Sequence, residues 1–424
     1  MASWSRKVVH MSRKKVLFVT ARSPYPLDTG AKIRTWNILS GYADRYDVDV
    51  LHFSDPSVEE KWQAAAKAIG VRSVHGVENQ AMNRPVTMGH VATAVIKGLP
   101  LSSLKYIRKD FSQRLMNMAA EGYDIVHVDT IHLAGELAAL NQLSTPPLTI
   151  INAHNVECQI AGRMRELESS LPRRMALSMH ARNMERFEKR AFALADMILA
   201  VSEEDRDRID AMAGVPGKAF LVENGVDENY YTPGMDQEID PNSLVFVGSM
   251  DWLPNVDGVK WFVTEILPLI RMQCPQAQLT IVGRSPHADV AALHSPERGV
   301  VVTGTVDDVR PYVRTASVVV VPLRFGGGTR LKILEAFAMK KAVVSTSLGA
   351  EGIQCQNGQH LCIESEAQVF AHACIKLMED VATRDALGEK GHSLALSRYS
   401  WTAVIRRMHE CVVERFIEGI RRDE

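Results

Sequence analysis

The feature that most constrains the fold of this chain is a repeated alternation of short apolar segments with amphipathic helical segments. Runs rich in β-branched residues precede stretches of helical periodicity such as Lys32–Ala43. Runs near five residues favour strands over buried helix segments, and continuous apolar strands are typical of parallel sheets covered on both faces. The first half is therefore predicted to contain strands at Val16–Thr20, Val48–Phe53, Ile125–Val128, Leu148–Asn152, Met197–Val201 and Ala219–Val222.

The alternation stops at a polar, turn-rich segment, residues 227–243, and then starts again. This segment contains Pro233, Gly234 and Pro241, and we interpret it as a linker. The sequence predicts an α/β protein with two doubly wound, Rossmann-like domains, residues 1–232 and 233–398, followed by a C-terminal helical segment, residues 399–424. The second strand set is predicted at Leu244–Val247, Leu279–Val282, Val300–Thr303, Ser317–Val321 and Ala342–Ser345.

Composition excludes several classes of protein. The chain has 49 Lys and Arg against 50 Asp and Glu, a formal net charge of −1, so no global field favours nucleic acid. No apolar run approaches the roughly 18–20 residues of a membrane-spanning helix. The six cysteines form no C-x-x-C pair, which argues against a zinc site or a disulfide framework and for buried thiols. We therefore expect a cytoplasmic protein without a nucleic-acid partner.

Glycine turns follow several predicted strands, where an open parallel sheet binds its ligands. Gly30 opens the first helix, Gly248 and Ser249 follow the first strand of the second half, and Gly283 and Arg284 follow the next one. A glycine at a strand end lets the backbone approach an anionic group closely. An ordinary turn is the alternative for each position, but the recurrence predicts a shared anion-binding site.

The most specific segment is the glycine loop between the strand Val318–Val321 and the helix Leu331–Met339. Consecutive backbone N–H groups at a helix N-terminus, together with positive charge, suit a pyrophosphate. Glu335, one turn into the helix, could accept hydrogen bonds from ribose hydroxyls. A flexible hinge is the alternative, and the spacing is not that of a Walker A loop. The residues expected to bind such a nucleotide here are Gly326, Gly327, Gly328, Thr329, Arg330, Lys332 and Glu335.

Polar residues also follow two strands of the first half. His154 comes directly after Leu148–Asn152, and His127, Asp129 and His132 lie at or after the preceding strand. We expect them to line one cleft, with His154 as the candidate catalytic residue. A metal site is an alternative, but nothing completes a ligand set.

In combination, these motifs resemble those of the retaining glycosyltransferases of family 4, which have the GT-B fold, and the resemblance covers almost the whole chain. The segments that carry it are the Gly30 loop, Ala153–Asn155, Val201-Ser202, Glu223–Asp227, Phe246–Ser249, Val282–Arg284, the glycine loop through Ala338, and Ser347–Gly352.

The resemblance implies transfer of a sugar, expected to be a hexose, from a UDP- or GDP-sugar to a saccharide or lipid-linked acceptor in polysaccharide biosynthesis. It implies retention at the anomeric carbon, with no cofactor and no metal ion. It places the active-site histidine at His154 and the ribose-binding glutamate at Glu335, and it makes Asp129 and His132 candidates for the acceptor side. It also implies that the second domain holds the nucleotide, the first holds the acceptor, and the last helix crosses back to the first domain.

Two positions depart from the family pattern. Gly327 stands where the first of two paired glutamates is expected, and Ser249 and its neighbours replace a usual Arg and Lys. We expect Arg330 and Lys332 to supply the missing charge. The alternatives are a nucleotide-sugar-binding scaffold subunit that has lost catalysis, which Gly327 favours, and another GT-B enzyme such as a sugar-nucleotide epimerase.

The segment 159–190 carries a surplus of positive charge. A solvated helix surface is one interpretation, and peripheral contact with the anionic inner face of a membrane is the other. Arg108 and Lys109 would add to such a face. The segment contains eight basic residues, Arg163, Arg165, Arg173, Arg174, Arg182, Arg186, Lys189 and Arg190, against the acidic Glu166, Glu168, Glu185 and Glu188.

Overall fold

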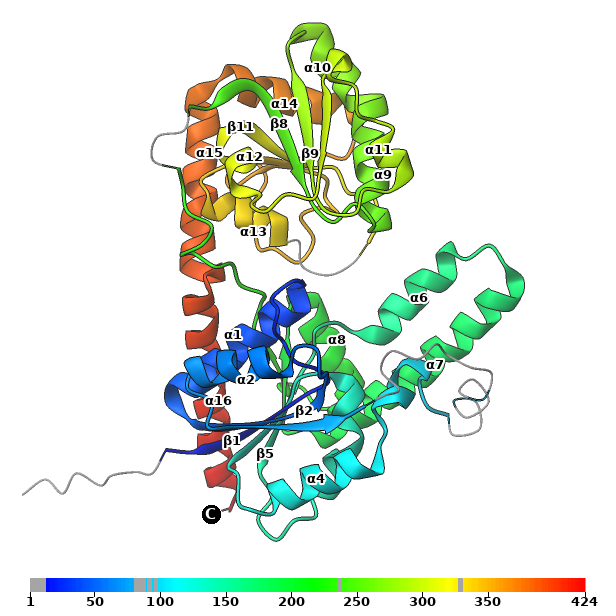
Figure 1. The fold of residues 1–424 in the computed structure, drawn as a ribbon, viewed down its shortest axis with the longest axis vertical. Helices are drawn as coiled ribbons and strands as arrows, with labels where there is room; N and C mark the ends of the chain where they lie inside the picture. The colour runs from blue at the N-terminus through cyan, green and yellow to red at the C-terminus, as the bar shows by residue number, and fades with distance from the viewer. Residues whose placement is uncertain are drawn as a thin grey trace, which may run out of the picture. The chain divides into compact units, whose positions relative to one another are not determined.

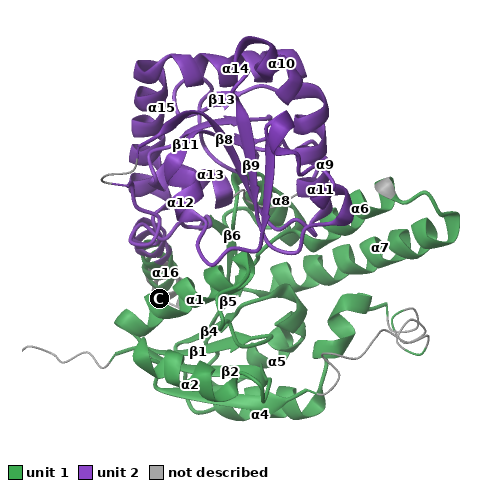
Figure 2. Cartoon of the chain, turned by 45° about the horizontal axis from the view of Figure 1, so that its top comes forward, with its two compact units in different colours: residues 1–221, 409–424 green, residues 222–408 purple. Residues whose placement is uncertain are grey.

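The computed structural model describes residues 13–79, 89, 94, 98–234, 238–326 and 331–423. The chain divides into two compact units, one formed by residues 1–221 with 409–424 and the other by residues 222–408 (Figure 2). Each unit is an α/β domain built on a parallel sheet (Figure 1), which confirms the predicted fold class.

Within the described residues, the sheet of the first unit has seven parallel strands in the order β3-β2-β1-β4-β5-β6-β7. The order reverses between β1 and β4, which is the point where a doubly wound sheet opens toward ligands. The strands are β1 (Lys15–Thr20), β2 (Asp47–Ser54), β3 (Ser73–Glu78), β4 (Ile125–Val128), β5 (Leu148–Asn152), β6 (Met197–Ala200) and β7 (Ala219–Leu221).

Helices cover both faces of this sheet, which explains its continuous apolar strands. On one face Phe18 of β1 contacts Tyr42 of α1, and Tyr42 in turn contacts His409 of α16. On the other face Leu17 and Val19 join a cluster with residues of α4, α5 and α8. The helices are α1 (Gly30–Arg45), α2 (Glu59–Ala68), η1 (Leu101–Tyr106), α4 (Lys109–Ala119), η2 (Ile131–Glu136), α5 (Leu137–Leu140), α6 (Glu157–Leu167), α7 (Leu171–Leu194), α8 (Glu203–Ala213) and α16 (Trp401–Asp423), which belongs to this unit from His409 on.

The sheet of the second unit has six parallel strands, counted over its described residues, in the order β10-β9-β8-β11-β12-β13. They are β8 (Asp240–Val247), β9 (Gln278–Val282), β10 (Val300–Gly304), β11 (Ala316–Val321), β12 (Ala342–Ser345) and β13 (Cys362–Ile363). The helices around it are α9 (Leu253–Trp261), η3 (Phe262–Ile266), α10 (Leu267–Gln273), α11 (Ala288–Ala291), η4 (Pro296–Arg298), α12 (Arg310–Thr315), α13 (Leu331–Ala338), α14 (Ala367–Glu379), α15 (Val381–Leu394) and η5 (Ala395–Tyr399).

The segment interpreted as a linker is largely part of the second unit. β8 begins at Asp240, inside that segment, and Val226 forms a parallel bridge with Ser400. The Val226 amide donates to the Tyr399 carbonyl at 2.7 Å, and the Trp401 amide donates to the Val226 carbonyl at 3.1 Å. The units accordingly divide after residues 221 and 408 rather than after 232 and 398.

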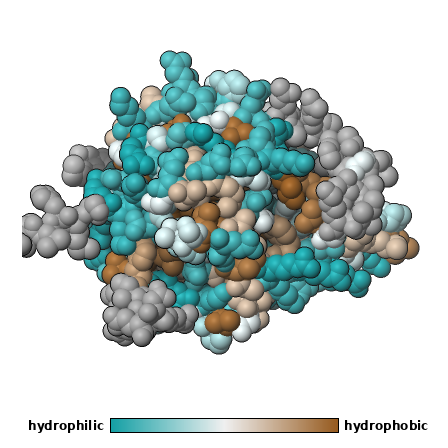
Figure 3. Space-filling view, turned by 90° about the horizontal axis from the view of Figure 1, so that it is seen from below, coloured by the Kyte–Doolittle hydropathy of each residue, from teal (hydrophilic) through white to brown (hydrophobic). Residues whose placement is uncertain are grey.

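Neither the described helices nor the face of the molecule in Figure 3 shows an extended apolar region. None of the helices among them is both long and apolar enough to cross a lipid bilayer. The face of the molecule drawn in Figure 3 mixes hydrophilic residues with small, separate apolar patches.

All six cysteines are free thiols, but only Cys374 is fully buried, so the expectation that all of them lie in the core was wrong.

Candidate functional site

Two predicted glycine turns of the second unit lie against each other at the carboxyl ends of β8 and β9. The Gly248 amide donates to the Val282 carbonyl at 3.0 Å, and the Met250 amide donates to the Arg284 carbonyl at 2.9 Å. A Cβ atom on Gly283 would lie 1.7 Å from the Gly248 carbonyl oxygen, so only glycine fits. The two turns therefore form one continuous backbone surface.

A lysine lies beneath the Gly248 turn. The Lys332 ammonium group donates to Asn255 Oδ1 at 2.9 Å and lies 4.1 Å from the centre of the Phe246 ring. Asn255 is buried, and its Nδ2 donates to the Ser249 carbonyl at 2.8 Å. A Cβ atom on Gly248 would lie 2.9 Å from Lys332 Nζ. Lys332 thus brings positive charge close to a backbone turn that lacks a side chain, which suits an anionic ligand.

Arg284 and Ser249 meet at the rim of the same turns. Arg284 Nε donates to Ser249 Oγ at 3.1 Å, and Ser249 Oγ donates to Asp251 Oδ1 at 2.6 Å. Arg284 is exposed, so its guanidinium group remains in contact with solvent. The rim therefore carries a cation whose position is fixed by a neighbouring hydroxyl.

The glycine loop joins β11 to α13 in the second unit. Gly326 adopts a φ of +121°, a conformation that favours glycine. The predicted donor residues Gly327, Gly328, Thr329 and Arg330 lie outside the described residues, so the predictions about them stand on the sequence alone. Lys332 and Glu335 lie in the first turns of α13.

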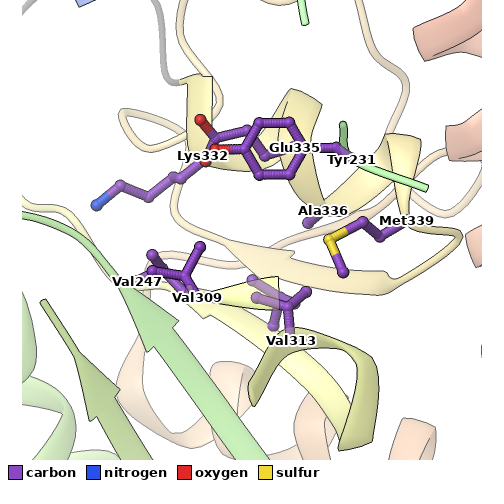
Figure 4. Close-up of a pocket in the computed structure, with 9 residues that line it drawn as sticks. Tyr231, Val247, Val309, Val313, Lys332, Glu335, Ala336 and Met339 are labelled. Atoms are coloured by element: carbon purple, nitrogen blue, oxygen red, sulfur yellow. The ribbon is translucent and has the colours of Figure 1, made fainter. Parts of the chain in front are cut away.

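Glu335 is bonded to a residue that the sequence analysis did not select. The Tyr231 hydroxyl donates to the Glu335 carboxylate, and the two side chains lie together at a small cavity (Figure 4). The cavity has a volume of about 10 Å³, room for about one water molecule, and most of its other lining residues are apolar. Burial raises the pKa of Glu335, although the Tyr231 hydrogen bond and the Lys332 charge favour its ionised form.

The segment Glu223–Asp227 is fixed by residues at the start of α16 and just before it. A Cβ atom on Gly225 would lie 2.5 Å from the Trp401 ring, so a residue with a side chain would displace the indole. The buried Glu223 pairs with Arg398 at 2.7 Å and with Arg407 at 2.8 Å. This segment is therefore a rigid part of the second unit.

In the first unit, His154 lies in a network of polar side chains at the carboxyl ends of β1, β4 and β5. His154 Nε2 is 2.8 Å from the Asp129 carbonyl oxygen and 3.4 Å from Asp129 Oδ1. The other carboxylate oxygen of Asp129 accepts hydrogen bonds from Thr35 at 2.6 Å and from Thr20 at 3.3 Å. Asn152 Nδ2 donates to Asp129 Oδ1 at 2.8 Å.

This network determines the tautomer of His154. Arg34 Nε donates to Asn152 Oδ1 at 3.0 Å, which leaves Asn152 Nδ2 facing Asp129. Because both groups of Asp129 near His154 are acceptors, a neutral His154 ring carries its proton on Nε2. Nδ1 is then the nitrogen that can accept a hydrogen bond from a ligand.

Asp129 has a different environment from the one expected of an acceptor-side residue. Its side chain is 5% exposed, so its carboxylate has little surface for a ligand. Burial opposes the ionisation of Asp129, but His154 and the Thr35 hydroxyl hold its pKa below the usual value. Asp129 is therefore an ionised partner of His154 inside the sheet.

His127 and His132 are not part of the His154 network. His127 is fully buried within β4 and stacks on Phe18 at 4.6 Å, so the expectation that it lines a cleft was wrong. His132 contacts Ser103 Oγ at 2.9 Å and stacks on Tyr106. Burial lowers the pKa of His127 to about 3 and that of His132 to about 4, so both rings are neutral.

The remaining predictions concern Gly30 and metal binding. Gly30 is exposed at the first residue of α1, whose N-cap is Thr29, and it belongs to the first unit rather than to the glycine turns of the second. Among the residues that the structure describes, no group of three or more His, Cys, Asp or Glu side chains could hold a metal ion.

The sequence analysis missed Arg34, Thr35, Asn152, Tyr231 and Asn255. Only Asn152 carried a local signal, since it is a polar residue at the end of an apolar strand. Arg34 lies between apolar helix residues and is 1% exposed, and nothing in the pattern marks it.

Comparison with known proteins relates both halves of the chain to glycosyltransferases. Residues 28–230 match a family model described as Glycosyltransferase Family 4, and residues 241–380 match one described as Glycosyl transferases group 1. A Klebsiella pneumoniae protein, named as an uncharacterized 44.6 kDa protein in the cps region, is 23% identical over 164 residues. That match covers 37% of this chain and 42% of the relative, so the chain aligns with less than half of it.

Solved structures show the same fold. The Anabaena protein HepE, in complex with UDP and glucose, is 17% identical with a TM-score of 0.61, and the match covers 95% of this chain and 100% of that one. Sucrose-phosphate synthase from Thermosynechococcus elongatus is 18% identical with a TM-score of 0.65, covering 96% of this chain and 100% of that one. The chain therefore belongs to the glycosyltransferases with the GT-B fold.

Proposed function

We propose that this glycosyltransferase moves a hexose from a UDP- or GDP-sugar to a saccharide or lipid-linked acceptor, with retention at the anomeric carbon and without a metal ion. The observation that carries the proposal is the backbone surface of Gly248 and Gly283 above the Lys332 ammonium group. A second-unit site of this kind suits the two phosphates of a nucleotide sugar. The HepE structure, which contains UDP, supports the same choice of ligand.

The chemistry of such a site follows from where charge develops. When the bond between the anomeric carbon and the phosphate oxygen breaks, negative charge accumulates on the leaving nucleotide. The Lys332 charge, with Arg330 as a further candidate, would stabilise this charge more in the transition state than in the ground state. Protein cations can do this without a divalent ion.

In the first unit, His154 is our candidate for the residue that lines the reacting face of the sugar. Its side chain is 18% exposed, and Asp129 holds its Nε2 proton, so Nδ1 and the backbone carbonyl of His154 are the groups that could face a ligand. Either group would position a sugar hydroxyl. The glutamate missing at Gly327 leaves the identity of the donor sugar to experiment.

A screen of UDP- and GDP-sugars for thermal stabilisation and hydrolysis tests the donor assignment. Glu335→Gln should weaken nucleotide binding by about 10- to 100-fold, whereas Glu351→Gln, at an exposed position, should not. His154→Ala should reduce transfer by ~10²-fold or more with little change in nucleotide affinity. Nucleotide binding without any turnover in the wild type would instead identify a binding subunit.

We also propose that the hairpin of α6 and α7 contacts the anionic inner face of a membrane. Three apolar side chains near its tip are exposed, Met164 at 55%, Leu171 at 63% and Met175 at 73%. Arg173 and Arg174 lie beside them and are exposed. Glu188 is buried, so it does not offset the surface charge of the hairpin. Apolar side chains beside arginines suit the boundary of an anionic bilayer.

Sedimentation with vesicles tests this contact. Binding to phosphatidylglycerol vesicles should exceed binding to phosphatidylcholine vesicles and should fall at least tenfold in an Arg173→Glu/Arg174→Glu variant, at about 1 kcal/mol for each basic residue near the surface. Lys61→Glu/Lys67→Glu, on α2 of the same unit, is the matched control. Equal losses in both variants would show only a general charge effect.

A further inference from the structure

The Tyr231 hydroxyl lies at the same small cavity as the Glu335 carboxylate and is a hydrogen-bond partner of that carboxylate. The hydroxyl of Tyr231 and the carboxylate of Glu335 lie together in Figure 4, although the two residues are separated by about a hundred positions in the chain. Glu335 is partly buried in the first turns of α13, and Tyr231 is partly buried in the segment before β8. The contact therefore joins two parts of the second unit that the sequence keeps apart.

The chain holds Tyr231 in a defined position. The Tyr231 amide donates to the Asp227 carbonyl at 2.9 Å, and the Asp227 carboxylate accepts from the amides of Asn229 and Tyr230, each at 3.0 Å. Immediately before this turn, Val226 is paired with Ser400. Because the turn is bonded at both ends, the Tyr231 ring arrives at Glu335 from a fixed direction.

The surroundings make the hydroxyl difficult to replace. The cavity beside the two side chains has room for about one water molecule, and its lining includes Val247, Val309 and Met339. Without the Tyr231 hydroxyl, the polar side chains of this lining are those of Lys332 and Glu335, which together provide the minimum number of partners that a buried water needs. Lys332 directs its ammonium group to Asn255 Oδ1. A neutral donor behind the carboxylate is therefore supplied by Tyr231.

We propose that Tyr231 is a positioning residue of the donor site, whose hydroxyl orients the Glu335 carboxylate so that it can accept hydrogen bonds from both hydroxyls of a nucleotide ribose. This rests on the proposed function, because it takes Glu335 as the ribose-binding group. With one donor fixed from behind, the carboxylate cannot rotate freely, and its remaining lone pairs are presented to the ligand. Tyr231 itself need not touch the nucleotide.

The neighbouring Tyr230 provides a matched control. It is 40% exposed, its ring stacks on the Arg310 guanidinium group at 3.8 Å, and its carbonyl accepts from Arg310 at 3.1 Å. These contacts involve the ring and the backbone. Removing the Tyr230 hydroxyl should therefore leave the donor site unchanged.

The test is a double-mutant cycle read by calorimetric titration of the full-length protein with UDP. Tyr231→Phe keeps the ring and should weaken UDP binding about three- to tenfold, whereas Tyr230→Phe should change it less than twofold. If Tyr231 acts through Glu335, adding Tyr231→Phe to Glu335→Gln should cost little more than Glu335→Gln alone. A full additional loss in the double variant would refute this role for Tyr231.

The pH dependence gives a readout that a purely structural role would not change. Burial raises the pKa of Glu335, and the Tyr231 hydrogen bond and the Lys332 charge oppose that rise. Without the hydroxyl the pKa should rise further, so the midpoint at which UDP affinity falls on acidification should move to higher pH in Tyr231→Phe. An unchanged midpoint and affinity would overturn the inference. If Glu335→Gln itself leaves UDP binding intact, it is the proposed ribose site that fails.

Discussion

Replacing Asp129 by asparagine should separate the charge of the His154 network from its shape. Asparagine has the same size, and its amide nitrogen can face the hydroxyls of Thr20 and Thr35. Each hydroxyl also lies within hydrogen-bond distance of a backbone carbonyl, Thr20 of Arg22 at 3.1 Å and Thr35 of Ala31 at 3.0 Å, so in the variant it can donate there and accept the new N–H group. The side-chain oxygen then keeps its contact with Asn152. What disappears is the negative charge 3.4 Å from His154 Nε2.

The expected magnitudes follow from this geometry. Exchanging charge-assisted hydrogen bonds for neutral ones should lower the free energy of unfolding by about 1–2 kcal/mol at neutral pH. Turnover should fall by about 10- to 100-fold even where the variant is fully folded, because a small misplacement of His154 changes the geometry of the reacting groups directly. Nucleotide affinity should hardly change, since its predicted site lies in the other unit.

The assay combines urea unfolding, steady-state transfer and UDP titration, with Asp124→Asn as the control. Asp124 is the residue before β4, and its carboxylate accepts hydrogen bonds from the Lys15 amide at 2.8 Å and from Lys14 Nζ at 3.1 Å. That variant should lose stability but keep its turnover. Normal turnover in Asp129→Asn would show that the carboxylate does not act on His154.

Three other outcomes follow from the structure and the proposal. Burial raises the pKa of Glu188 to about 7, although the amides of Glu157 and Cys158 donate hydrogen bonds to its carboxylate. The free energy of unfolding of the wild type should therefore decrease as the pH rises from about 5 to 7. Glu188→Gln should remove this slope in urea unfolding measured at several pH values. His132→Ala should cost about 1–2 kcal/mol of stability without altering UDP affinity, and a raised acceptor KM would support its acceptor-side assignment. Treatment with EDTA should leave transfer largely intact, whereas loss of activity with rescue by magnesium or manganese would contradict a metal-independent reaction.

The strands were predictable wherever both faces of the sheet are covered. Predicted strands such as Leu148–Asn152 and Ala342–Ser345 match β5 and β12 residue for residue, because continuous burial leaves a continuous apolar run. β3 and β13 lie at sheet edges and were missed. β3 is half exposed and contains His75 and Gly76, and β13 has two residues, so neither produces such a run.

By itself the sequence determined where the backbone must pack closely against another group. Gly283 and Gly225 are glycines because a Cβ atom would meet a carbonyl oxygen or an indole ring, and such positions are visible as glycines after strands or in a short motif. The sequence also placed His154 at a strand end, where parallel sheets bind ligands.

Only the tertiary structure decided which side chains act together. Asp129 meets Thr35, Asn152 and His154 because β4, α1 and β5 bring them to one edge of a sheet, and Tyr231 meets Glu335 across about a hundred residues. Hydrogen bonds of this kind depend on distances of about 3 Å between segments far apart in the chain. The pattern of residue types within one helix or strand reflects burial and backbone geometry in that element. It does not indicate which side chain of another element will form a hydrogen bond with it.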